Sequence, residues 1–203
     1  MAVLSISETD LLKNADNVYE NIAKDYPFLK TGSTRVKGVM LSRWWSYTGT
    51  TGVYCPWTLE ANVNTDVPVM ELGFTSAHEI AHTMGFAKEN ECNFLAFLSC
   101  TASGQPDYEY SGYFSALIYC SNALYKADKV LWKKAVSNCS QGVIRDLNFK
   151  SDYWDSFKGE VMDNSQSFND SFIKANGVES GALSYNEMVG LMLRYYDYQG
   201  FLA

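Results

Sequence analysis

The 203-residue sequence predicts an α+β domain that is predominantly helical, with a small sheet in its N-terminal third. Residues 36–64 contain short runs in which apolar and polar residues alternate, divided by the glycine-containing loop at residues 49–52. From residue 74 onward, apolar residues recur at helical spacing, and Pro106 is the only proline. The chain is 47% apolar and has no long internal repeat, so we expect one domain over residues 1–203.

The individual elements follow from local patterns. Residues 8–25 predict an amphipathic helix that ends before Pro27, with Ser7 as its cap and Asp10 as the capping partner. Strands are expected at residues 36–42, 53–55 and 59–64, the last two in an antiparallel sheet. Helices are expected at 74–84, 88–102, 108–125, 127–138, 141 to about 175, and 184–198, with breaks at 104–106 and 177–181.

Composition excludes several classes of protein. The formal charge is −7, and both signs are scattered without a basic cluster, so nucleic acid is not an expected partner. The five cysteines are odd in number and form no C-x-x-C pair, so we expect small buried side chains and leave open a single disulfide. No apolar run reaches the roughly 18 residues of a membrane-spanning helix, and the start does not resemble a signal peptide, so the chain is expected to be soluble. The sequence does not indicate an oligomeric state.

Both histidines of the protein lie in the segment His78-Glu79-x-x-His82. On a helix they are one turn apart and point the same way, so two imidazoles can bind one metal ion while Glu79 accepts a proton beside it. The apolar residues of this helix form an arc next to the histidines, which leaves the polar edge facing a cleft. Gly85 is expected to end the helix in a left-handed conformation. The pattern predicts one catalytic zinc ion.

The third zinc ligand must be a carboxylate or a thiolate, because the chain has no third histidine. Glu89 and Asn93 share one face of the next expected helix, whereas Glu91 points roughly the opposite way. We therefore predict Glu89 as the ligand and keep Glu91 as the alternative. Asn93 is expected to hydrogen-bond a ligand imidazole and fix its tautomer. Cys92 and Cys100 fit this role less well, because thiolates suit closed structural zinc sites.

These roles predict hydrolysis of peptide bonds. A bound zinc ion lowers the pKa of its water to about 7, and Glu79 accepts the proton and passes it to the leaving amine. The group that stabilises the oxyanion is not identifiable from the motif. Tyr110 and Tyr185 are candidates, because each stands in a short polar opening before an expected helix.

Once Glu89 and Asn93 are placed, E-x-x-x-N after H-E-x-x-H resembles the glutamate-ligand zincins (gluzincins), many of which have aspartate where Asn93 stands. A closer resemblance covers most of the chain. Residues 51–64, 78–96, 110–113 and 184–189 resemble an uncharacterised bacterial family, a domain of unknown function regarded as membrane-anchored zinc metallopeptidases.

The resemblance implies a zincin-like fold and a peptide or protein substrate whose identity it does not supply. It also implies that natural members carry membrane-spanning segments before such a domain, which would place it on the extracytoplasmic face of a bacterial cytoplasmic membrane. In zincins generally, a strand such as residues 59–64 would be an edge strand that pairs with an extended substrate.

Three other functions stay open at this point. The same residues would hold zinc for stability alone in a non-catalytic sensor or scaffold domain of a membrane protein. A metal-free helical interaction protein would have both histidines satisfied in its core. An amidase acting on cell-wall material would use the same chemistry as a peptidase on another amide bond.

Overall fold

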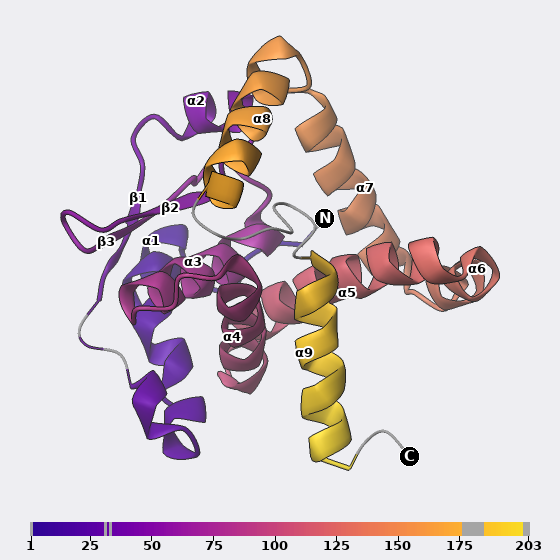
Figure 1. Ribbon diagram of the computed structural model, residues 1–203, viewed down its shortest axis with the longest axis horizontal. Coiled ribbons are helices and arrows are strands. Elements are labelled where there is room, and N and C mark those ends of the chain that lie inside the picture. The colour runs from indigo at the N-terminus through magenta and orange to yellow at the C-terminus, as the bar shows by residue number, and fades with distance from the viewer. Residues whose placement is uncertain (1, 31, 33, 176–184, 201–203) are drawn as a thin grey trace.

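A computed structural model describes residues 2–30, 32, 34–175 and 185–200 of the chain (Figure 1). The strands are β1 (Val36–Gly38), β2 (Gly52–Cys55) and β3 (Glu60–Val63). The α-helices are α1 (Glu8–Lys13), α2 (Ser42–Tyr47), α3 (Val69–Thr83), α4 (Glu89–Ala102), α5 (Pro106–Ala127), α6 (Lys129–Ser137), α7 (Gln141–Asp155), α8 (Glu160–Ala175) and α9 (Tyr185–Tyr198). Three 3₁₀ turns, η1 (Ala15–Tyr19), η2 (Ile22–Lys24) and η3 (Pro27–Leu29), complete the N-terminal region. The expected class, α+β and predominantly helical, is confirmed.

The N-terminal helix is shorter than its sequence predicted. Ser7 caps α1 as expected, and its hydroxyl accepts the N–H of Asp10 at 3.0 Å. The α-helix ends at Lys13, because the Asn14 amide donates to the carbonyl of Asp10 and the chain continues as 3₁₀ turns. The prediction of a continuous helix over residues 8–25 is therefore wrong. The apolar side chains of this stretch are nevertheless buried, namely Leu11, Leu12, Ala15, Val18, Tyr19 and Ile22.

The sheet has β3 in the middle, parallel to β1 and antiparallel to β2. The antiparallel pairing of the second and third strands is confirmed, but the expectation that residues 59–64 form an edge strand is wrong. β1 ends at Gly38 rather than at residue 42, because Ser42 begins the unpredicted helix α2. The Ser42 hydroxyl donates to the carbonyl of Val39 and accepts the N–H of Thr65 at 2.8 Å.

Helix α3 lies at the centre of the molecule. It packs against β2 and β3 on one side and against α4 and α5 on the other, and α9 covers α4 and α5 (Figure 1). Ala77, Ile80 and Ala81 are fully buried, as their arc on the helix predicted. The Tyr19 hydroxyl donates to the carbonyl of Ala77 at 2.7 Å, which ties α3 to the N-terminal turns. The position of α3 is thus fixed from several sides.

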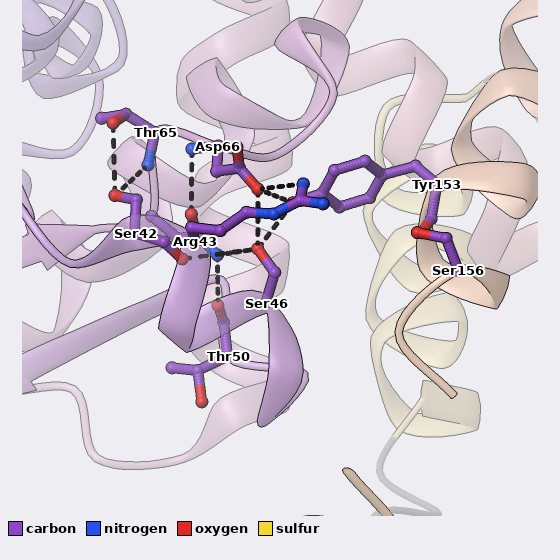
Figure 2. A network of polar contacts seen from close by, with 9 residues as sticks. Ser42, Arg43, Ser46, Thr50, Thr65, Asp66, Tyr153 and Ser156 are labelled. Atoms are coloured by element: carbon purple, nitrogen blue, oxygen red, sulfur yellow. Dashed lines mark hydrogen bonds and ion pairs between the residues drawn. The ribbon is translucent and has the colours of Figure 1, made fainter. Parts of the chain in front are cut away.

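A buried polar network joins α2 and the β3–α3 connection to α7 (Figure 2). The fully buried Asn64 donates to the Ser46 hydroxyl at 3.0 Å, and its side-chain oxygen accepts the N–H of Asp66 at 2.9 Å. The Asp66 carboxylate also accepts the Tyr153 hydroxyl at 2.8 Å and the Arg43 guanidinium at 3.0 Å. Because buried and half-buried polar groups are costly unless satisfied, this network specifies how α7 meets α2 and the β3–α3 connection.

The C-terminal half contains the expected helices with one difference. Residues 141–175 form two helices, α7 and α8, with a break at residues 156–159. Figure 1 shows α7 rising away from α6 and α8 returning toward the sheet. A second contact anchors α7 to the first turn of α3, where Glu71 accepts hydrogen bonds from Lys150 and from the Trp154 indole. The break expected at residues 177–181 lies outside the described residues.

All five cysteines are free thiols. Cys92 and Cys100 are buried as expected, whereas Cys55, Cys120 and Cys139 are half-buried.

Candidate metal centre

The side chains of His78 and His82 project from one face of α3 with their rings in contact. Their ring centroids are 4.8 Å apart, and each side chain is little more than a tenth exposed. The apolar arc beside this face is buried against the sheet and α4, so the face that carries the histidines is the one left toward the surface. The two imidazoles therefore meet at a half-closed surface, as their one-turn spacing predicted.

Glu89, the first residue of α4, completes a group of three potential ligands. Its carboxylate lies 3.1 Å from Nε2 of His78 and 3.6 Å from Nε2 of His82, and the two Nε2 atoms are 3.1 Å apart. In a tetrahedral zinc site with bonds of about 2.0–2.1 Å, ligand atoms lie roughly 3.3 Å from one another. The three atoms thus fit one zinc ion, and this is the one such group in the described part of the chain.

A sharp turn between α3 and α4 brings Glu89 to the histidines. Gly85 has a φ of 95°, as expected for a glycine that ends a helix in a left-handed conformation. Its N–H donates to the carbonyl of His82 at 3.0 Å, and the N–H of Phe86 donates to that of Ala81 at 3.3 Å. This is the hydrogen-bond pattern of a Schellman motif, which satisfies the last carbonyls of α3 while reversing the chain.

The same turn orients the imidazole of His82. The carbonyl of Phe86 lies 2.8 Å from Nδ1 of His82, so the proton on Nδ1 leaves the lone pair of Nε2 free for a metal ion. The Cys92 thiol lies behind this contact, 3.4 Å from Nδ1 and 3.3 Å from the Phe86 carbonyl. Burial raises the pKa of Cys92, which keeps it a neutral thiol. The tautomer of His82 is therefore fixed by the backbone carbonyl of Phe86, which no side-chain motif indicates.

Asn93 lies beside the other histidine. Its side chain is 8% exposed and favours the charged form of His78. Nδ1 of His78, however, is buried with no hydrogen-bond partner among the described residues. The Asn93 amide thus acts on His78 as a neighbouring dipole, beyond the reach of an ordinary hydrogen bond to Nδ1.

The protonation states of His78, His82 and Glu89 depend on one another. Burial disfavours the charged form of His78, but the hydrogen bond to Glu89 and the charge of Glu79 outweigh it and raise the His78 pKa. Burial lowers the pKa of His82, and the neighbouring charge of His78 lowers it further. Burial would raise the pKa of Glu89, but its hydrogen bond with His78 lowers it overall. His78 and Glu89 therefore favour each other's charged form.

Glu79 lies next to this group, where α3 faces β2. It is 4% exposed, and burial raises its pKa to about 7, although the charge of His78 opposes the change. The backbone N–H of Tyr54 donates to its carboxylate and also lowers the pKa. A carboxyl group in this condition exchanges a proton near neutral pH.

Strand β2 supplies the wall that encloses Glu79. A Cβ on Gly52 would lie 2.4 Å from Oε1 of Glu79 and 2.8 Å from its Cγ and Cδ, so only glycine leaves room for this carboxylate. Two residues further along, the Tyr54 ring stacks on the His82 ring with centroids 6.2 Å apart and planes 14° apart. Gly52 and Tyr54 thus border the candidate site, and the H-E-x-x-H motif does not indicate either of them.

We expect Gly52→Ala to destabilise the protein by about 1–3 kcal/mol, because the new methyl group overlaps the Glu79 side chain. In a Glu79→Ala background the same substitution should cost little, since the colliding atoms are gone. Urea unfolding of the four proteins of this cycle measures the coupling. Gly142→Ala is the matched control, because its Cβ would meet nothing closer than 3.7 Å. Equal costs in both backgrounds would contradict the contact.

The raised pKa of Glu79 predicts a pH-dependent stability of the metal-free protein. The folded carboxyl binds a proton more tightly than the unfolded one, so its contribution is complete below about pH 4.5 and lost as the pH rises through about 7. Between pH 5 and pH 8 the free energy of unfolding should therefore fall by up to about 3 kcal/mol more in wild type than in Glu79→Gln. Urea unfolding in EDTA at both pH values measures this, and parallel pH profiles would refute it.

The remaining candidates lie away from the ligand group or outside the described side chains. Glu91 forms an ion pair with Lys88 at 3.2 Å on the outer face of α4. The Tyr110 hydroxyl donates to Asp146 at 2.7 Å and faces a pocket near the start of α3. The side chain of Tyr185 lies outside the part that the structure describes. Neither Glu91 nor Tyr110 is part of the group formed by His78, His82 and Glu89.

Comparison with known proteins places the chain in a family. Among the described residues, no helix is both long and apolar enough to cross a bilayer. No curated protein and no solved structure matches the chain significantly. Residues 3–193 match the family model described as "Protein of unknown function (DUF3810)". Since the match covers nearly the whole sequence, the chain belongs to the DUF3810 family.

Proposed function

We propose that the protein is a zinc-dependent metallopeptidase. The observation that carries the proposal is the meeting of Nε2 of His78, Nε2 of His82 and the Glu89 carboxylate, with separations of 3.1–3.6 Å. Two neutral imidazoles and one carboxylate are a common ligand set of hydrolytic zinc, and a site with three protein ligands leaves a position for water. The Glu89 side chain is 41% exposed, so this group reaches the protein surface.

Residues of this chain would have separate roles in the hydrolysis. Zinc, when bound, supplies a water molecule of lowered pKa and polarises a carbonyl group. Glu79 would take the proton of the attacking water and deliver it to the leaving amine, for which a pKa near 7 is well suited. Gly52 and the Tyr54 N–H would hold the Glu79 carboxylate in place. Phe86, through its carbonyl, would keep His82 in the tautomer that binds metal.

The arrangement of elements supports a zincin-like fold. The His78-Glu79-x-x-His82 helix α3 is followed by a glycine turn and by a second helix that starts with the third ligand. An edge strand, β2, runs alongside Glu79 and His82. β2 takes the place that the sequence suggested for residues 59–64, so its free edge would pair with an extended peptide substrate.

The cellular setting is a proposal that rests on the resemblance alone. The domain would be held at the extracytoplasmic face of a bacterial membrane by segments outside this chain. Its substrate would be a peptide or protein in that compartment, and nucleic acid is not proposed as a partner.

Two measurements on the purified protein test the proposal. Metal analysis, with anomalous diffraction at the zinc edge, should find one zinc ion on His78, His82 and Glu89. A peptide library digested by wild type and by Glu79→Gln should show cleavages that depend on Glu79. Tight zinc binding without any Glu79-dependent cleavage would instead favour a non-catalytic zinc domain. A lack of zinc binding would exclude both the metallopeptidase and the non-catalytic zinc domain.

A further inference from the structure

Positive charge collects at the helical corner formed by the end of α5 and by α6. Lys126, Lys129, Lys133 and Lys134 lie within nine residues, and Asp128 is the only acid among residues 110–145. The whole chain carries a charge of −7. The expectation of scattered charges without a basic cluster is therefore wrong here, since this corner is a basic area on an acidic protein.

Nothing within the described part of the chain neutralises these lysines. The Asp128 carboxylate caps α6 and accepts the N–H groups of Val130 at 2.7 Å and Leu131 at 2.9 Å. None of the four lysines forms an ion pair with a described residue, and the Lys129 ammonium lies 5.1 Å from the centre of the Tyr125 ring. The four charges are thus available to an anionic partner.

Apolar side chains stand exposed among the lysines. Helix α6 has no buried residue, and Val130 and Leu131 are 78% and 53% exposed. At 100° per residue, Val130 projects between Lys133 and Lys134. Trp132 turns inward instead, where its indole donates to Ser121 at 2.8 Å. The outer face of α6 therefore combines ammonium groups with aliphatic side chains that no described part of the protein covers.

We propose that this corner docks on the surface of a bilayer that contains anionic phospholipids. The lysines would contact headgroup phosphates, and Val130 and Leu131 would enter the boundary between headgroups and acyl chains, while the lysine stems extend around them. A nucleic acid would use the charges but not the aliphatic side chains, and α6 contains no arginine to read base edges. The mixture of the two kinds of side chain favours lipid.

This surface is separate from the metal centre. The lysines and exposed aliphatic residues lie on α5 and α6, whereas the ligand group lies on α3 and α4. Figure 1 shows α6 projecting at the end of the molecule remote from the sheet. Membrane binding and hydrolysis can thus be tested independently, and either proposal survives failure of the other.

Co-sedimentation of the purified chain with vesicles tests the proposal. Vesicles of phosphatidylcholine with about 30% phosphatidylglycerol should bind the protein in low salt, whereas pure phosphatidylcholine should not. Reversing Lys129, Lys133 and Lys134 to Glu should weaken binding more than a hundredfold, since each lysine contributes roughly fivefold. Lys13→Glu, Lys24→Glu and Lys30→Glu together are the matched control, with the same change of net charge at exposed positions elsewhere.

A second test of the membrane-docking proposal changes the exposed aliphatic side chains. Val130→Ser with Leu131→Ser should weaken vesicle binding severalfold without changing its dependence on salt, and binding to heparin should stay as it was. Equal weakening by the control lysine triple would show that only net charge matters and would overturn the proposal. An unaffected serine double variant, or tighter binding to duplex DNA than to the vesicles, would also overturn it in favour of a purely electrostatic surface.

Discussion

Replacing Glu79 with Gln should lower kcat on a cleaved peptide by about 10²–10⁴-fold while leaving the zinc content unchanged. Glutamine keeps the shape of the side chain beside Gly52 but has no lone pair basic enough to take a proton from water. The three potential metal ligands are unchanged in this variant, because Glu79 is not among them.

The measurement combines metal analysis with steady-state kinetics on a peptide taken from the library. Glu91→Gln is the matched control, because it makes the same chemical change on α4 at a carboxylate paired with Lys88. If Glu79→Gln retained the activity of wild type, Glu79 would not be the base. If both variants lost activity together, the loss would not be specific to the site.

The second large effect concerns metal binding itself. At a free zinc concentration about 1,000 times the dissociation constant, binding should stabilise the fold by roughly 4 kcal/mol. For a chain of this size that corresponds to a rise in Tm of about 8–16 °C. His82→Ala and Glu89→Ala should abolish the rise at the same zinc concentration, because each removes one of only three ligand atoms.

Thermal unfolding with and without zinc, at constant ionic strength, measures the shift. Glu91→Ala should keep the full rise, which separates the two acidic candidates for the third ligand directly. A rise that survived in Glu89→Ala but vanished in Glu91→Ala would move the ligand to Glu91 and would require α4 to rotate. Zinc that left the Tm of wild type unchanged would contradict the metal centre as a whole.

Local periodicity predicted the half of the site that lies on helices. His78, His82 and Glu89 are close in sequence, and 100° per residue places His78 with His82 on one face of α3 and Glu89 with Asn93 on one face of α4. Gly85 was predictable for the same reason, because a glycine after the last helical turn ends helices in a left-handed conformation. The pairing of His78 with His82 therefore needed no knowledge of the tertiary fold, whereas the approach of Glu89 depends on how α4 packs against α3.

The half that lies on the sheet was not predictable in this way. Which of two antiparallel strands becomes the edge depends on where β1 joins, and β1 joins β3 rather than β2. The alternation of apolar and polar residues is the same in either case, so it does not show whether residues 53–55 or residues 59–64 form the edge strand. Gly52 and Tyr54 gain their roles from that long-range choice. The breakdown of the first helix into 3₁₀ turns likewise follows from a side-chain contact of Asn14, which helical spacing cannot detect.

The short turn at Gly85 has a consequence for the order in which the site forms. All three potential ligands lie within residues 78–89, so closing the chelate costs little chain entropy. A zinc ion could be captured by a nascent pair of helices before the rest of the domain has folded. The surroundings of Glu79 depend instead on Gly52, and this contact requires the β2–β3 hairpin to dock on α3. Contacts between more distant parts of a chain form more slowly than local ones. During folding, metal capture would therefore precede the formation of a competent base.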